Sequence, residues 1–207
     1  KALEEVILKN LDKKSLALGD EGGFAPKISD IRTPLLYLTE VIKEHNLEHR
    51  VRLALDVAAS SFYKDGQYHI GGGAITAQEL LGVYDSLISE FNLLSIEDPF
   101  YEEDFESFAQ LRAKHPDLIV VGDDLTVTNK TLLEKATNSK SINGIIIKPN
   151  QIGTLTETLA TMSLARDSEI ELIISHRSGE TGQFAESKTY PEVLFERFFF
   201  KNFGSLV

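Results

Sequence analysis

The sequence predicts an α/β fold built around a parallel sheet, and three observations carry that prediction. Short runs of Val, Ile and Leu alternate with longer amphipathic stretches, which is the pattern of repeated strand–helix units. The apolar runs are nearly continuous, as expected for parallel strands covered on both faces. Polar residues follow almost every run. Because the carboxyl ends of all strands ring one mouth of a (β/α)₈ barrel, whereas an open sheet gathers ligand groups at one switch point, this pattern favours the barrel.

The individual elements follow from the same patterns. Strands are expected at the apolar runs Ser15–Leu18, Val51–Asp56, Leu93–Ile96, Leu118–Val121, Gly144–Ile147 and Glu171–Ile174. Helices are expected at Thr33–Asn46, Thr76–Phe91, Asp104–Lys114, Lys130–Thr137 and Thr154–Arg166. Two of these helices open with a capping box, Thr76 with Glu79 and Thr154 with Glu157, in which the two residues satisfy each other's free backbone donors.

The composition excludes several classes of partner and of metal site. The 207 residues suit one domain or a large part of one. The net charge of −11 argues against nucleic acid or an anionic membrane as a partner. There is no cysteine, so disulfides and thiolate metal sites are excluded, and a metal site would use oxygen ligands with histidine as an addition. No stretch approaches the roughly 18 apolar residues of a membrane span.

Three carboxylates end different apolar runs: Asp56, Glu97 and Asp123. Three such charges converging in a water-poor mouth would repel one another, and a hard divalent cation removes that cost. Magnesium takes a few carboxylates, keeps waters and shares substrate oxygens. Each acid taken alone is better explained by a helix cap or a solvent-exposed position. The three together, with Lys148 after the next run, favour a metal site.

Other polar residues at strand ends suit acid–base chemistry and anion binding. Lys148 directly follows three isoleucines, where it would serve as a general base or simply neutralise the carboxylates. Glu21 lies beside Gly22 and Gly23 and would be a general acid or an ordinary loop carboxylate. A cluster of hydroxyl, imidazole and guanidinium groups suits a phosphate or carboxylate: Ser175, His176, Arg177 and Ser178.

Two further patterns carry less weight. The run Gly71-Gly72-Gly73 lacks the Lys-Ser/Thr ending of a phosphate-binding loop, and a surface loop is expected there. The pairs Asp123-Asp124 and Lys148-Pro149 are also features of phospho-acceptor receiver domains. In receiver domains, however, most of a domain separates the two pairs, so the single strand–helix unit between them here argues against that function.

Six segments, taken together, resemble successive signature segments of the enolase (phosphopyruvate hydratase) family, in the family's order. They are Gly19-Asp-Glu-Gly-Gly-Phe-Ala-Pro26, Leu55-Asp-Val-Ala-Ala-Ser-Ser-Phe-Tyr63, Ser95-Ile-Glu-Asp-Pro99, Gly122-Asp-Asp-Leu-Thr-Val-Thr-Asn129, Lys148-Pro-Asn-Gln-Ile-Gly153 and Ser175-His-Arg-Ser-Gly-Glu-Thr181. The resemblance implies a TIM-type (β/α)₈ barrel of which about strands 2 to 7 are present. It also implies a cytoplasmic glycolytic lyase, a homodimer when complete, that interconverts 2-phosphoglycerate and phosphoenolpyruvate with Mg²⁺.

The resemblance also assigns roles to the candidate residues. Asp56, Glu97 and Asp123 would hold Mg²⁺, Lys148 would remove the proton from carbon 2, and Glu21 would protonate the departing hydroxyl. Substrate contacts are implied for Glu97, Asp123, Lys148, Ser175, His176, Arg177 and Ser178. A Lys or His base paired with magnesium is the general pattern of this superfamily.

The resemblance ends at Thr181, which predicts a barrel region over 1–181 and a divergent tail over 182–207. The family's amino-terminal domain, its first barrel strand and its last-strand segment Gly-Gln-Ile-Lys-Thr-Gly are not found in these 207 residues. The chain is therefore expected to be an incomplete form with doubtful activity by itself. The alternative is a non-catalytic remnant or binding protein that keeps the metal site.

Overall fold

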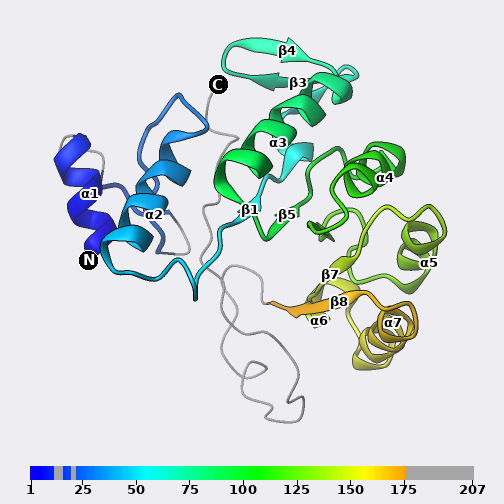
Figure 1. Cartoon of the computed structure of the whole chain (residues 1–207). Coiled ribbons are helices and arrows are strands. Elements are labelled where there is room, and N and C mark those ends of the chain that lie inside the picture. Colours follow the sequence, from blue (N-terminus) through cyan, green and yellow to red (C-terminus); the bar gives the residue numbers. More distant parts are fainter. Residues whose placement is uncertain (12–15, 20–21, 176–207) are drawn as a thin grey trace. The chain divides into compact units, whose positions relative to one another are not determined.

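The computed structural model describes residues 1–11, 16–19 and 22–175 and divides the chain into two compact units (Figure 1). The first unit contains Lys1–Ile96, and the second begins at Glu97. Strand β5 (Ser95–Glu97) crosses this boundary. In the described part of the chain, no helix combines the length and the apolar character needed to cross a bilayer.

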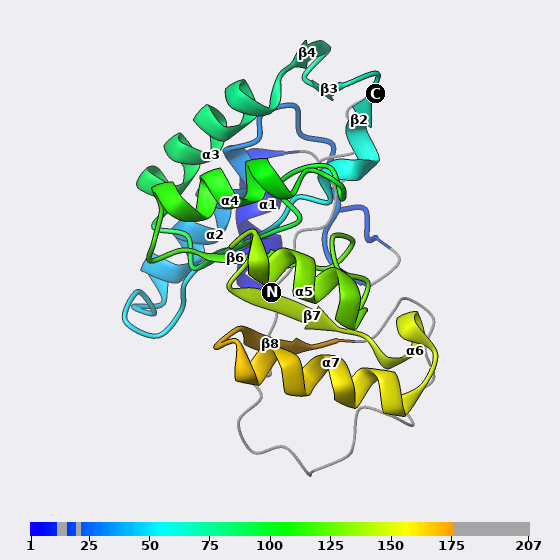
Figure 2. The ribbon, with the colours of Figure 1, turned by 90° about the vertical axis from the view of Figure 1, so that its right-hand side faces the viewer.

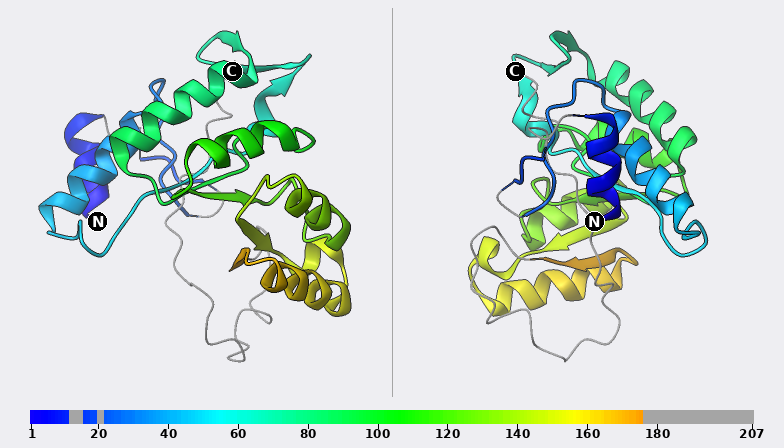
Figure 3. Two further views of the ribbon diagram at one scale, coloured as in Figure 1. Left: turned by 45° about the vertical axis from the view of Figure 1, so that its right-hand side comes forward. Right: turned by 90° about the vertical axis from the view of Figure 1, so that its left-hand side faces the viewer.

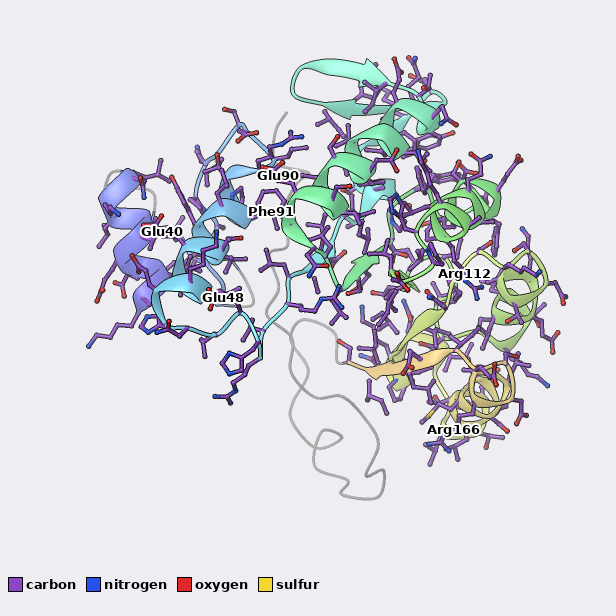
Figure 4. The ribbon with its side chains drawn as sticks, viewed as in Figure 1. Glu40, Glu48, Glu90, Phe91, Arg112 and Arg166 are labelled. Carbon is purple, nitrogen blue, oxygen red and sulfur yellow. The ribbon has the colours of Figure 1, made fainter. Side chains whose placement is uncertain are left out.

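The first unit contains two helices before its first strand, α1 (Ala2–Asn10) and α2 (Thr33–Glu44). An ion pair of 2.9 Å joins Lys9 of α1 to Glu40 of α2. A second pair of 2.9 Å joins Arg32, at the start of α2, to Glu90 of helix α3 (Ala77–Phe91); Glu40 and Glu90 are labelled in Figure 4. Both pairs are solvent-exposed, so packing of the buried helix faces contributes more to stability than these charges do.

Strand β1 (Ala54–Asp56) and a short antiparallel sheet complete the first unit. The amide of Leu94 donates to the carbonyl of Leu53 at 2.7 Å, so the chain entering β5 runs beside β1. A 3₁₀ turn (Ala59–Phe62) leads into β2 (Tyr63–Lys64), β3 (Gln67–Ile70) and β4 (Gly73–Ile75). The expected surface loop is confirmed at Gly71 and Gly72, which are exposed and have positive φ angles of 60° and 80°. It is wrong at Gly73, which begins β4 and pairs with Ile70.

One predicted strand is wrong. Ser15 lies outside the described residues, and Leu18 forms only an isolated antiparallel bridge with Phe24. The amide of Gly19 donates to the carbonyl of Gly23 at 2.8 Å, and that of Ala25 donates to Ala17 at 2.8 Å. The segment therefore pairs with the residues that follow it, which a pattern of apolar residues does not reveal.

The second unit repeats the strand–helix order along the chain. Its elements are α4 (Phe105–Lys114), β6 (Ile119–Gly122), α5 (Lys130–Asn138), β7 (Gly144–Ile147), α6 (Pro149–Ile152), α7 (Leu155–Asp167) and β8 (Glu171–Ile174). Strands β6, β7 and β8 are parallel, with Val121 opposite Gly144 and Ile147 opposite Ile174. Figure 2 shows β7 and β8 side by side with α7 running along them, and the left view of Figure 3 shows α5 beside α7.

The core of this unit explains why β7 is the best-formed strand. Ile145, Ile146 and Ile147 are all fully buried, as expected for a parallel strand covered on both faces. The side chain of Asn143 accepts from the amide of Val120 at 2.6 Å and donates to the carbonyl of Leu118 at 2.9 Å. Arg112 of α4, labelled in Figure 4, donates to the carbonyl of Ile142 at 2.7 Å. These hydrogen bonds hold the start of β7 against β6 and α4.

Gly144 leaves no room for a side chain, which makes it a sensitive test of this packing. A Cβ at this position would lie 2.8 Å from Cγ2 of Ile119 and 3.1 Å from Cγ2 of Val121. Gly144→Ala should therefore destabilise the chain by about 1–3 kcal/mol, the usual cost of overpacking. Urea unfolding followed by circular dichroism measures this change. Gly82→Ala is the matched control, since its added Cβ would meet nothing within 4 Å beyond its chain neighbours and the nearby backbone of its own helix; equal stability of both variants would contradict the packing described.

Candidate metal and acid–base site

Three buried carboxylates meet where β5 and β6 end. Glu97 is the last residue of β5, Asp98 follows it, and Asp123 follows β6. Each is at most 7% exposed, and each offers an oxygen within 4.8 Å of the others. Burying three acids this close is costly unless a cation or hydrogen-bond donors compensate. The cluster therefore offers oxygen ligands of the kind that a hard divalent cation takes.

Asp98 has a structural role in this cluster. Its backbone has a positive φ of 42°, and its amide donates to the carbonyl of Val121 at 3.0 Å. Its carboxylate accepts the amide of Asp123 at 3.0 Å and that of Asp124 at 2.8 Å. Asp98 thus fixes the turn that carries Asp123, which is why it lies in the cluster although the sequence patterns did not select it.

The environment of Asp98 opposes ionisation. Burial raises the pKa of the Asp98 carboxyl well above its usual range, and the nearby carboxylates of Asp124, Glu97 and Asp123 act in the same direction. The backbone amide of Asp124 lowers the same pKa, but it does not outweigh burial. Asp98 therefore loses its proton less readily than an ordinary aspartate in this poorly solvated cluster.

Lys148 lies against the cluster from the next strand. It directly follows β7, and its Nζ donates to Oδ2 of Asp123. Both side chains are largely buried, 13% and 10% exposed. The amide of Lys148 donates to the hydroxyl of Thr128 at 2.9 Å. Of the predicted group of Asp56, Glu97, Asp123 and Lys148, the structure thus brings together Glu97 with Asp123 and Asp123 with Lys148.

The loop after β6 is held tightly under Asp123. The carbonyl of Asp123 accepts the amides of Thr126 at 3.2 Å and Val127 at 2.7 Å. A Cβ on Gly122 would lie 3.3 Å from Cγ2 of Thr126, so a glycine lets the loop pack back on the strand. Val127 and Thr128 have φ angles of 41° and 58°, which β-branched residues rarely adopt. Backbone strain of this kind persists where surrounding contacts over-determine the conformation.

The remaining predicted site residues are placed only in part. Ser175 directly follows β8, and its amide donates to the carbonyl of Ile147 at 3.0 Å, one residue before Lys148. Asp56 ends β1 in the first unit and is 8% exposed. Glu21, His176, Arg177 and Ser178 lie outside the described residues.

Comparison with known proteins matches nearly the whole described chain. A family model described as "Enolase, C-terminal TIM barrel domain" matches residues 1–188. A protein named enolase from Methanocaldococcus jannaschii is 48% identical over 179 residues, which is 86% of this chain and 42% of that relative.

Two further enolases give similar values. The one from Campylobacter jejuni is 45% identical over 168 residues, 81% of this chain and 41% of the relative. The one from Sulfolobus acidocaldarius is 43% identical over 181 residues, 87% of this chain and 44% of the relative. The chain thus spans about two fifths of the length of the curated relatives that it matches.

Proposed function

The chain belongs to the enolase family, and from this premise we propose that it carries residues for the reversible dehydration of 2-phosphoglycerate to phosphoenolpyruvate, a lyase reaction of glycolysis. The family domain is a TIM barrel, so the barrel prediction is confirmed over the open sheet. The observation that carries the proposed chemistry is the buried group of Glu97, Asp98 and Asp123 with Lys148 beside it.

The donor set fits Mg²⁺. Carboxylate oxygens within 4.8 Å of one another, in a chain without cysteine, suit a hard cation better than a soft one. We assign Glu97 and Asp123 to this ion together with Asp56, while Asp98 is engaged by two backbone amides. When bound, Mg²⁺ supplies positive charge next to the substrate carboxylate, where negative charge develops during the reaction.

The chain's own residues would move the two protons. Lys148 Nζ takes the proton from carbon 2, and the electron pair of that C–H bond forms the carbon 2–carbon 3 double bond. The bond from carbon 3 to its hydroxyl oxygen breaks, and Glu21 supplies the proton with which the hydroxyl leaves as water. In the structure Lys148 Nζ donates to Asp123, so the amine has to give up a proton and leave that carboxylate before its lone pair can accept the carbon 2 proton.

Substrate binding is proposed for the residues around the same mouth. Arg177 and Ser178 suit the phosphate, since a guanidinium with neighbouring hydroxyls binds phosphate oxygens well. Ser175 and His176 would make further polar contacts to the substrate. Support comes from the position of Ser175 directly after β8, next to the strand that ends at Lys148. Glu97, Asp123 and Lys148 would also approach the substrate.

Magnesium affinity tests this assignment directly. Isothermal titration of the chain with MgCl₂ should show binding that Asp123→Ala weakens at least tenfold, about 1.4 kcal/mol. Asp117→Ala is the matched control, because it removes an equal charge from an exposed position in the same unit. Equal affinities for the unsubstituted chain and Asp123→Ala would overturn the site.

The alternative of a non-catalytic protein that keeps the metal site predicts the same magnesium affinity. This alternative predicts that the carbon 2 proton of 2-phosphoglycerate does not exchange with solvent, even in a chain completed with the flanking segments of a relative. This alternative is weighed because the chain covers only about two fifths of the length of the curated relatives.

Domain limits, location and assembly are part of the same proposal. We place the barrel region at 1–181 and a divergent tail at 182–207, while the family match itself extends to residue 188. A cytoplasmic location and a homodimeric complete enzyme are proposed on family membership. The net charge of −11 argues against nucleic acid as a partner, and a bound cation would offset the local negative charge toward a small anionic substrate.

A further inference from the structure

The contacts of the Thr128 hydroxyl limit where its single proton can point. It is fully buried, and its hydroxyl oxygen accepts the backbone amide of Lys148 at 2.9 Å. A backbone amide can only donate, so the hydroxyl proton of Thr128 has to point elsewhere. Two acceptors are in range: Oε1 of Gln151 at 3.1 Å and the carbonyl of Ile146 at 3.5 Å. The shorter and better contact is the one to Gln151.

This single proton determines how the amide of Gln151 is oriented. With the hydroxyl proton of Thr128 in the shorter of the two contacts, the atom that it meets is the oxygen of Gln151 and not its nitrogen. The nitrogen Nε2 then faces Oδ1 of Asp123, at 3.5 Å, the long end of hydrogen-bond range. Lys148 Nζ lies against the other oxygen, Oδ2. Both oxygens of Asp123 are thus met by donors from the segment 148–151.

The backbone around Thr128 is fixed from two sides. The hydroxyl of Thr161, fully buried on α7, donates to the carbonyl of Thr128 at 2.8 Å. The amide of Asn129 donates to the carbonyl of Thr126 at 2.7 Å. On the other side, the amide of Gln151 donates to the carbonyl of Lys148 at 2.9 Å, which closes the turn that carries both side chains. The left-handed φ of 58° at Thr128 is therefore held in place by contacts on each side.

We propose that Thr128 and Gln151 are positioning residues for Asp123: the Thr128 hydroxyl sets the orientation of the Gln151 amide, and that amide with Lys148 holds the carboxylate. Neither residue is assigned a contact with substrate. The consequence for metal binding rests on the proposed function, since it requires that Asp123 is a magnesium ligand. Hydrogen-bonded partners of a ligand fix its orientation, and their loss usually weakens metal affinity about 10–100-fold.

The orientation of the amide is tested without any metal. In ¹⁵N-labelled chain, the side-chain NH₂ signals of Gln151 should be separated and slow to exchange, and Asp123→Asn should shift them. Thr128→Val, which keeps the branched shape, should make these signals resemble those of a free glutamine, while Thr128→Ser should restore them. Thr126→Val is the matched control, because Thr126 is equally buried in the same loop but its hydroxyl donates only to the carbonyl of Gly122. Unchanged signals in Thr128→Val would overturn the inference.

The positioning role is tested by titration with MgCl₂ alone. Thr128→Val and Gln151→Met should each weaken binding about 10–100-fold, whereas Thr126→Val and Thr128→Ser should bind like the unsubstituted chain. Gln151→Met keeps the length of the side chain and decides the matter if Thr128→Val fails to fold. If the unsubstituted chain binds magnesium and both variants bind equally well, the inference is wrong and the proposed function stands. If the unsubstituted chain binds none, the proposed function and the positioning role both fail, while the amide signals still decide the orientation.

Discussion

Lys148→Ala should abolish exchange of the carbon 2 proton of 2-phosphoglycerate with solvent in a chain completed with the flanking segments of a relative. The carbon 2 proton is very weakly acidic, because its loss adds charge next to a carboxylate. A positioned general base contributes roughly 10²–10⁴ in rate, so loss of the Lys148 amine, which lies against the buried carboxylate of Asp123, should remove most of the exchange. Proton NMR in heavy water with Mg²⁺ measures exchange without requiring loss of the hydroxyl.

Two further variants separate the roles of base and acid. Glu21→Gln should block dehydration, followed as phosphoenolpyruvate absorbance, but leave more of the exchange, because Glu21 acts only on the departing hydroxyl. Lys130→Ala is the matched control, since Lys130 also pairs with a carboxylate, Glu134 at 3.8 Å, but on the surface. Exchange at the unsubstituted rate in Lys148→Ala would mean that another residue is the base.

The 207-residue chain expressed by itself should turn over 2-phosphoglycerate at a rate near background, even where it folds and binds magnesium. It spans about two fifths of its relatives, and these 207 residues do not include the lid domain, first-strand glutamate and last-strand lysine that the resemblance implies for a complete enolase. Loss of one preorganised charge-stabilising group costs about 2.7–4 kcal/mol, or roughly 10²–10³ in rate. A lid that excludes water strengthens the remaining electrostatic terms, so its absence adds to the loss, although such losses need not sum.

The assay follows phosphoenolpyruvate absorbance with saturating Mg²⁺, on a sample first shown to be folded and monodisperse. A chain completed with the flanking segments of a relative is the positive control. Turnover of the 207-residue chain within tenfold of an ordinary enzyme's roughly 10 s⁻¹ would refute this prediction. It would also mean that residues after Thr181 supply the groups counted as lacking.

Much of the fold was predictable because its strands are buried and its helices carry local start signals. Strands β7 and β8 have the predicted bounds, Gly144–Ile147 and Glu171–Ile174. Helix α3 begins after Thr76 with both bonds of the predicted capping box. At α7 only one bond of the predicted capping box is present, the one from the backbone amide of Glu157 to the Thr154 hydroxyl oxygen. The Glu157 carboxylate accepts from the Thr154 hydroxyl instead of from the Thr154 backbone amide.

The elements that were not predicted have weak local patterns. Helix α1 (Ala2–Asn10) lacks a side-chain cap at its start, and α6 is only one turn long. The small sheet of β2, β3 and β4 has strands of only two to four residues, and none of them is a continuous run of Val, Ile and Leu. Such strands are stabilised by pairing with each other, and pairing partners cannot be deduced from periodicity.

For the site, sequence reasoning found the charges but not the groups that hold them. Glu97, Asp123 and Lys148 were found because each follows an apolar run, and the structure brings them together. Asp98, Thr128 and Gln151 were not selected, because their importance lies in hydrogen bonds between segments about 20 to 26 residues apart. The predicted roles of Asp56, Glu21, His176, Arg177 and Ser178 stay predictions.

The close fit at Gly144 also bears on how the chain avoids folding errors. Parallel strands can slip by two residues and still keep the same side chains on each face. Such a slip of β7 would bring Ile142 or Ile146 to the place of Gly144, where even a Cβ would lie 2.8 Å from Ile119. It would also break both bonds from the Asn143 side chain to Leu118 and Val120. Gly144 and Asn143 thus both disfavour a slipped register of β7, and the correct register is the one that brings Lys148 beside Asp123.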